Sequence, residues 1–136
     1  MTGMGRVSSI DQEFAAVTDH WSPRVVADLN GQSVKVAKIQ GDLTWHAHAD
    51  EDELFLIWKG SMVIEYRDRP PVRLGAGDVH VVPRGVEHNP VADEECWVVL
   101  FEPSETKHTG DVVMSKTKTV SAQRIHLHHQ VDGNAS

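Results

Sequence analysis

The sequence predicts an all-β barrel or sandwich. About eight short segments rich in β-branched and aromatic residues follow one another from residue 24 to residue 101, and turn residues separate them. Short strands at regular spacing, with turns between them, are typical of this class. The segment shows no helix-length apolar periodicity, which argues against a parallel α/β sheet. A chain of 136 residues, 40% of them hydrophobic, suits one domain over residues 1–136, with a barrel core from about 24 to 103.

One short helix is expected before the strands, over residues 9–18. Ser8 or Ser9 can cap it, and the acidic side chains of Asp11 and Glu13 favour its first turn. Its apolar residues recur at helical spacing and are Ile10, Phe14 and Val17. Such a helix can pack on the outside of a barrel or on a partner subunit.

The strands are expected over residues 25–29, 34–39, 43–48, 54–58, 62–66, 72–74, 79–82 and 95–101. Asn30-Gly31 separates the first two, and Asn-Gly between β-prone segments is the strongest short-range signal of a hairpin. Beyond Pro103 the chain becomes polar. A turn is expected at residues 109–111 and a disordered tail from about residue 131.

The composition restricts the classes of partner. The formal net charge is −7 with histidine counted as neutral, which argues against nucleic acid and against an anionic membrane surface. A small molecule or another protein is therefore expected. Apolar segments are all shorter than the roughly 20 residues that span a bilayer, and residues 1–10 lack the pattern of a secretory signal. These features predict a cytoplasmic protein. The single cysteine, Cys96, excludes an internal disulfide and is expected to be buried.

His46, His48 and Glu53 form the first motif that carries chemistry. Side chains at positions i and i+2 of a strand point to the same face, so the two imidazoles can share a metal ion. The polar turn at residues 49–52 allows the chain to reverse and to bring Glu53 back beside them. Glu51 and Asp52 are competing carboxylates, and strand phase alone does not choose among the three. Imidazoles with a carboxylate suit borderline or hard divalent metals.

The second motif supplies a third imidazole. His88 follows Pro83 and Gly85, which force a turn at the end of one strand and start the next segment. Taken singly, each histidine would be an ordinary polar residue near a strand end. Taken together, the spacings predict a site of three histidines and one carboxylate. Such a site leaves two octahedral positions open for water, substrate or dioxygen.

The first motif resembles that of the cupin superfamily. The cupin pattern is Gly, about five residues, His-x-His, three or four residues, Glu, six residues and Gly. The chain has Gly41, four residues, His46-x-His48, four residues, Glu53, six residues and Gly60. The leading spacer is one residue short, and no ligand position departs from the pattern.

The second motif resembles the other cupin signature, which is Gly, five residues, Pro-x-Gly, two residues, His, three residues and Asn. The chain has Gly77, five residues, Pro83-x-Gly85, two residues and His88, with Ala92 where the family has Asn. The surrounding sequence is similar to a group of short bacterial cupins labelled mannose-6-phosphate-isomerase-like. That similarity indicates a fold and a metal, and adds little about the reaction.

The resemblance implies a double-stranded β-helix, or jelly-roll, barrel with a short N-terminal helix. It implies one divalent transition metal, such as zinc, iron, manganese or nickel, on His46, His48, Glu53 and His88, and it selects Glu53 over the neighbouring carboxylates. Cupins of this size usually pair, and a strand-rich barrel has edges to cover, so a homodimer is expected.

Three functions fit this site. The first is a small-molecule enzyme of oxygenase, isomerase or cyclase type, with Glu53 as general base. The second is a ligand-binding or sensory module without catalysis, and the third is a metal that only stabilises the fold. His80, in an expected strand, can line the pocket or face the surface. The histidine tract at His126, His128 and His129 has two explanations, which are a second metal site and a flexible tail.

Overall fold

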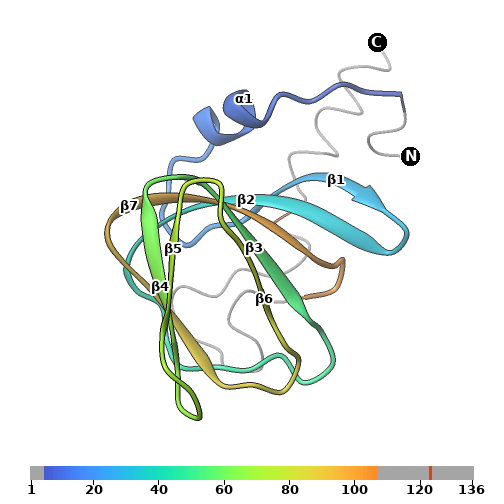
Figure 1. Cartoon of the computed structure of the whole chain (residues 1–136). Coiled ribbons are helices and arrows are strands. Elements are labelled where there is room, and N and C mark those ends of the chain that lie inside the picture. Colours follow the sequence, from blue (N-terminus) through green and yellow to red (C-terminus); the bar gives the residue numbers. More distant parts are fainter. Residues whose placement is uncertain (1–4, 107–122, 124–136) are drawn as a thin grey trace.

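The computed structural model describes residues 5–106 and Gln123. Over these residues the chain is a barrel of antiparallel strands with one short helix on its outside (Figure 1). The turn expected at residues 109–111, the histidines of residues 126–129 and the tail from residue 131 lie outside the described residues. Among the described residues, none of the helices is long and apolar enough to cross a membrane.

The elements in chain order are α1 (Ile10–Ala15), β1 (Arg24–Leu29), β2 (Gln32–Asp42), β3 (Glu53–Lys59), β4 (Ser61–Tyr66), β5 (Val72–Gly75), β6 (Val79–Val82) and β7 (His88–Pro103). The sheet runs in the order β1-β2-β7-β3-β6, and β4 pairs with both β5 and the first part of β7. The long strand β7 therefore joins both walls of the barrel. This architecture is the jelly roll that the sequence predicts.

The first hairpin has the predicted turn. Leu29 pairs with Gln32, and the two residues between them, Asn30 and Gly31, have φ angles of 50° and 74°. Positive φ at both central positions is the geometry of a type I′ turn, which Asn-Gly adopts at little cost. The turn fixes the register of β1 against β2, and β2 in turn carries residues that face the barrel interior.

The strand predicted over residues 43–48 is wrong. The chain leaves β2 after a register shift between Ile39 and Gly41, whose φ of +80° suits glycine, and it continues as extended backbone. Only His46 in this stretch forms a β-bridge, with His88. Strand β7 conversely begins at His88 and not at residue 95, because pairing with β4 overrides the weak strand propensity of its polar first half.

Helix α1 is shorter than predicted. Ser9 caps it by accepting a hydrogen bond from the Gln12 N–H, and it ends at Ala15 and not at residue 18. The Val17 N–H donates to the Phe14 carbonyl at 3.0 Å, which tightens the last turn and ends the helix.

Apolar side chains form two clusters, one on each face of the sheet. The inner cluster fills the barrel and includes Phe55, Ile57, Met62, Ile64 and Val98. The outer cluster lies beneath α1 and consists of Phe14, Val17, Val26, Val36 and Val99. The alternation of burial along β2, β3 and β7 follows from these two faces. The helix therefore covers part of the outer face, and the inner face is left to build a site.

Candidate metal centre

The backbone brings the two histidine motifs together. The His46 N–H donates to the His88 carbonyl at 3.0 Å, and the His88 N–H donates to the His46 carbonyl at 2.9 Å. The Gly85 N–H donates to the His48 carbonyl at 2.7 Å, which ties His48 to the turn before β7. Three backbone hydrogen bonds thus fix the relative position of three histidines from two separate stretches of the chain.

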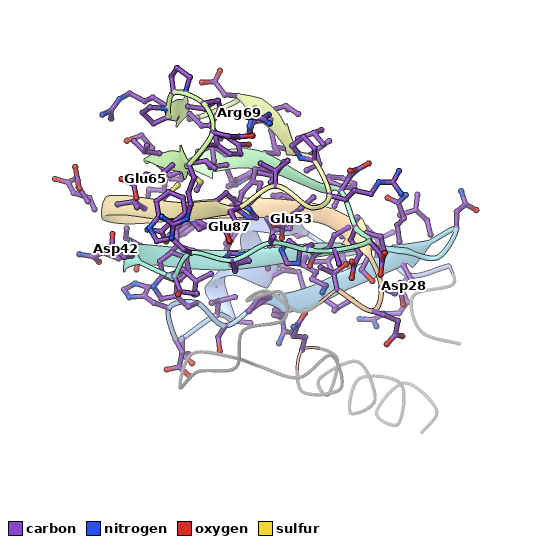
Figure 2. The ribbon with its side chains drawn as sticks, turned by 90° about the horizontal axis from the view of Figure 1, so that it is seen from below. Asp28, Asp42, Glu53, Glu65, Arg69 and Glu87 are labelled. Carbon is purple, nitrogen blue, oxygen red and sulfur yellow. The ribbon has the colours of Figure 1, made fainter. Side chains whose placement is uncertain are left out.

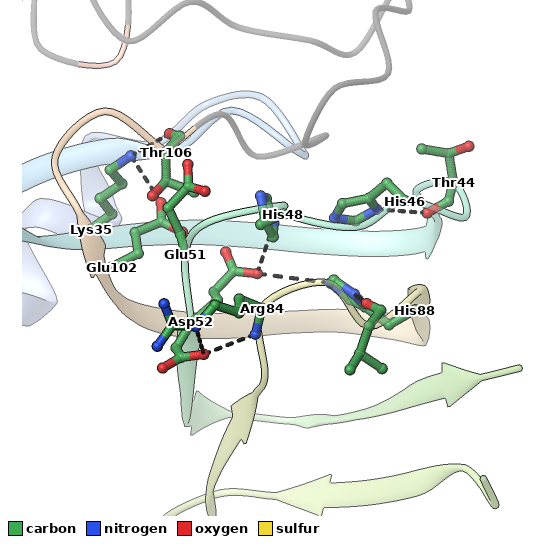
Figure 3. Close-up of polar contacts among 12 residues, drawn as sticks. Lys35, Thr44, His46, His48, Glu51, Asp52, Arg84, His88, Glu102 and Thr106 are labelled. Carbon is green, nitrogen blue, oxygen red and sulfur yellow. Dashed lines mark hydrogen bonds and ion pairs between the residues drawn. The ribbon is translucent and has the colours of Figure 1, made fainter. Parts of the chain in front are cut away.

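The imidazole rings face one another inside the barrel (Figure 3). The ring centroid of His46 lies 5.0 Å from that of His48 and 4.3 Å from that of His88. One ring nitrogen from each of the three residues lies within 4.8 Å of the others. All three side chains are buried, and His88 has no exposed surface. This close group of nitrogens could hold a metal ion.

Backbone carbonyls fix the tautomers of two rings. The His46 Nδ1 lies 2.9 Å from the Thr44 carbonyl oxygen, and the His88 Nδ1 lies 3.0 Å from the Val86 carbonyl oxygen. A carbonyl only accepts hydrogen bonds, so Nδ1 carries the proton and the lone pair is on Nε2. Metal-ligating histidines are oriented in the same way in proteins. Burial lowers the pKa of His88 to about 4, so this imidazole is neutral near pH 7 and its lone pair is available.

Glu53 lies beside the histidines as the first residue of β3. Its Oε1 is 3.3 Å from His48 Nε2 and 3.9 Å from His88 Nε2, and its side chain is 3% exposed. Figure 2 shows Glu53 within the barrel, whereas Asp28 and Arg69 lie at its edges. Burial raises the pKa of Glu53, and the neighbouring Glu102 side chain opposes part of that rise.

The competing carboxylates lie elsewhere. Asp52 accepts a hydrogen bond from the Arg84 N–H at 2.8 Å, and Glu51 accepts one from the Asp50 N–H at 3.0 Å. Both hydrogen bonds are exposed contacts of the turn between the histidines and β3. The residue spacing therefore brings Glu53, and not its two acidic neighbours, to the three imidazoles.

A buried polar group behind Glu53 was not predicted from the sequence. Glu102 on β7 lies opposite Glu53 on β3, and the Nζ of Lys35 on β2 lies 2.8 Å from Glu102 Oε1. Burial and the nearby charge of Glu53 raise the pKa of Glu102 well above its usual value. The sequence feature that could have revealed Lys35 is the alternation in β2, which places it on the same face as the apolar residues Ala37 and Ile39.

His80 faces the barrel interior. Its Nε2 lies 2.7 Å from the hydroxyl oxygen of Tyr66, which is itself buried, and the Tyr66 ring centroid lies 6.4 Å from that of His88. Burial, followed by the charge of Arg69, lowers the pKa of His80. His80 therefore belongs to the wall around the histidines, which is one of the two positions that the sequence left open for it.

A cavity of about 30 Å³ opens beside His46 and Glu53. Apart from these two polar residues its wall is largely apolar and includes Trp21, Ile39, Leu43, Phe55 and Leu100. The Trp21 indole N–H donates to the Gln40 carbonyl at 2.9 Å, so its ring is held in place as one side of the wall. The space admits about one or two water-sized molecules next to the imidazoles.

The donor set fits a divalent ion. Three imidazoles and one carboxylate suit zinc, iron, manganese and nickel, and the nitrogens already point to one place. The cavity adjoins that place, because His46 and Glu53 also form part of its wall. Four protein ligands would close a tetrahedral zinc site, whereas an octahedral ion on the same ligands would keep two open positions.

Comparisons with known proteins agree with this architecture. The cupin domain family (Cupin_2) matches residues 33–102, which is just over half of the chain. A cupin-2 domain containing protein from Shewanella frigidimarina NCIMB 400 is 41% identical, with a TM-score of 0.70, over 74% of this chain and 97% of that protein. The protein NMB1881 from Neisseria meningitidis is 28% identical, with a TM-score of 0.67, over 72% of this chain and 99% of that protein.

One curated relative is also similar. YdbB of Bacillus subtilis (strain 168), described as uncharacterized, is 33% identical over 63 residues. These residues make up 46% of this chain and 56% of YdbB, so the match spans less than two thirds of that relative. The family match runs from Ser33 to Glu102 and so includes all three histidines and the strands that carry the rest of the site. On these grounds the chain belongs to the cupin domain family.

Proposed function

We propose that this chain is a metal-dependent enzyme that acts on a small molecule, with one divalent ion held by His46, His48, Glu53 and His88. The observation that carries the proposal is the convergence of three imidazoles and one carboxylate, of which His46 and Glu53 line a small cavity. When bound, such an ion supplies Lewis acidity, or dioxygen activation if it is iron. Oxygenase, isomerase and cyclase reactions are all compatible with these ligands.

The residues of the chain have distinct roles in this proposal. The carboxylate of Glu53 lines the cavity, where it is placed to accept a proton from a bound substrate as a general base. The apolar wall formed by Leu43, Phe55 and Leu100 excludes water and packs against the carbon skeleton of that substrate. The cavity is small, so a substrate of more than a few atoms must extend into the mouth or displace part of the wall.

Turnover of a defined substrate panel tests the proposal. The full chain, purified without a metal-affinity column, is loaded with Zn²⁺, Fe²⁺, Mn²⁺ or Ni²⁺ and incubated with enols, hydroxyketones and sugar derivatives, with and without dioxygen. We expect metal-dependent product formation that His88→Ala abolishes. The matched control is Asp52→Asn, which removes an exposed neighbouring carboxylate, keeps an acceptor for the Arg84 N–H and should leave turnover unchanged.

Other outcomes would point to the two remaining functions. Saturable binding of a panel compound, with no product from any of the four metals, would favour a non-catalytic ligand-binding or sensory module. A metal that stabilises the fold while no compound binds would favour a structural role. Either result would overturn the proposal of an enzyme.

The expected homodimer, the cytoplasmic location and the mannose-6-phosphate-isomerase-like subgroup stay predictions. The edge strand β6 exposes Val79 and Val81, with 57% and 45% of their surfaces accessible. Apolar side chains on an edge strand favour pairing with another chain. Light scattering coupled to size-exclusion chromatography measures the mass directly, and a monomer mass would contradict the predicted dimer.

A further inference from the structure

The most unusual buried group outside the proposed ligands is Lys35. Its side chain is 1% exposed, although lysine is among the residues that are almost never fully buried. The ammonium group has three oxygen partners: Glu102 Oε1 at 2.8 Å, the Thr106 carbonyl at 3.1 Å and Gln123 Oε1 at 2.6 Å. Two of these contacts are hydrogen bonds, to Thr106 and Gln123, and the contact with Glu102 is an ion pair. The position of the Lys35 nitrogen is therefore fixed.

Strand register connects this lysine to the metal centre. Leu54 on β3 pairs with Phe101 on β7, so Glu53 and Glu102, the next residues of these antiparallel strands, meet on the inner face. On the other side of β7, Ser33 pairs with Glu102 and Lys35 pairs with Leu100, which puts Lys35 diagonally across from Glu102. Three adjacent strands thus present Lys35, Glu102 and Glu53 in one row that ends at the histidines.

Stability alone is a weak reason for this row. Taking an ammonium and a carboxyl group out of water costs more than most buried ion pairs return, and well-packed apolar side chains of similar volume are usually as stable or more stable. Beyond Lys35, the inward-facing positions of β2 include the apolar residues Ala37 and Ile39, and Leu100 faces inward on β7. A polar row inside such a core therefore suggests that these residues hold another side chain in position.

We propose that Lys35 and Glu102 are positioning residues of the metal centre. Lys35 holds the Glu102 carboxyl group, and Glu102 holds the carboxylate of Glu53 on the side where its Oε1 faces His48 and His88. Without this row, the Glu53 side chain can rotate about its χ angles. Its Oε1 then no longer stays beside His48 and His88. This inference rests on the proposed metal site and adds two residues to it that do not contact the ion.

Metal affinity in a double-mutant cycle tests the proposal. The main variant replaces the whole pair, Lys35→Met with Glu102→Leu, because removing only one partner leaves a buried group without compensation. Zn²⁺ affinity of the full chain is measured by competition with a chromophoric chelator. We expect the pair replacement to weaken Zn²⁺ binding by about 10-fold or more, as other residues that orient metal ligands do. The control is Lys38→Met, a lysine of the same strand that packs on Trp97 on the outer face.

The cycle separates positioning from general support of the fold. In a Glu53→Gln background, the pair replacement should cause no further loss of Zn²⁺ affinity, because its effect passes through Glu53. Equal losses in both backgrounds would overturn the proposal, as would an unchanged affinity in the native background. The absorption spectrum of the Co²⁺-loaded pair variant should shift toward that of Glu53→Gln, which a role confined to folding would not produce.

Two further measurements keep the outcomes distinct. If the pair replacement does not fold, the near-isosteric Glu102→Gln takes its place in the same cycle, with the same expected non-additivity. If the unaltered chain binds Zn²⁺ no more tightly than His88→Ala does, the proposed metal site fails and this inference fails with it. If the unaltered chain binds Zn²⁺ and the pair variants bind equally well, this inference alone fails.

Discussion

His46 and His88 exchange two backbone hydrogen bonds, each N–H donating to the carbonyl of the other residue. The loop that carries His46 lies outside the sheet. This single β-bridge holds the loop against His88, the first residue of the longest strand, β7. Because each Nδ1 also lies beside a carbonyl two residues earlier in the chain, both rings are oriented by local backbone. Backbone contacts therefore orient two of the three imidazoles, which is the kind of preorganisation that a binding site requires.

Metal binding should stabilise the folded chain. Loading with Zn²⁺ at about 100 times its Kd should raise the free energy of unfolding by roughly 2.7 kcal/mol, because the ion binds only where the ligands converge. Thermal unfolding with Zn²⁺ and with chelator measures this difference. In His88→Ala the two curves should coincide, and an equal shift in that variant would show that the ion binds elsewhere.

Gly60 should be intolerant of a side chain. Its φ is +86°, and a Cβ there would lie 2.9 Å from the Glu95 carbonyl oxygen, so backbone would have to move. Gly77 is the matched control, because its φ is +88° and a Cβ there meets nothing within 4 Å. Gly77→Ala should cost about 1–2 kcal/mol for backbone strain, and Gly60→Ala about 1–3 kcal/mol more. Urea unfolding compares the two, and equal losses would refute the close approach.

Cys96 should be unreactive in the folded protein over a wide pH range. Burial raises the pKa of its thiol from 9.0 to about 12, because an apolar environment disfavours the thiolate. At a given pH below 9 the folded chain therefore holds roughly 1,000-fold less thiolate than the chain unfolded in urea. Alkylation rates with iodoacetamide at pH 7, 8 and 9 check this. An alkylation rate of the folded chain equal to that of the unfolded chain would contradict the prediction.

Helix α1 should contribute strongly to stability through one residue. Phe14 is fully buried and its ring stacks on Trp97 with centroids 4.9 Å apart. Phe14→Ala should therefore lower the free energy of unfolding by about 3–5 kcal/mol. Gln12→Ala on the exposed side of the same helix is the control and should change stability little. A loss of unfolding free energy of similar size in both variants would mean that the helix stabilises the chain by forming, and not by packing on the sheet.

Local patterns explain what could be predicted from the sequence. The hairpin at Asn30 and Gly31 depends on two adjacent residues, and the antiparallel barrel depends on strand-length alternation, so both are visible in short windows. The approach of His46, His48 and His88 follows from spacings within two motifs. Strand phase alone could not choose among Glu51, Asp52 and Glu53. The resemblance to cupins selected Glu53.

The remaining features depend on register between distant strands. Lys35 and Glu102 meet because β2 and β3 both pair with β7 in one particular register, which no single window of sequence reveals. The Tyr66 contact to His80 likewise joins β4 to β6, which share no ladder. The early start of β7 at His88 comes from pairing with β4, and its polar residues gave no local sign of a strand.

The metal content of the full chain tests the central claim most directly. Protein purified without a metal-affinity column, and then equilibrated with Zn²⁺ and desalted, should contain one ion per chain by mass spectrometry of the elements. His88→Ala treated in parallel should contain close to none. A chain that retains no ion, or a variant that retains as much as the native protein, would contradict the assignment of His46, His48, Glu53 and His88 as the ligands.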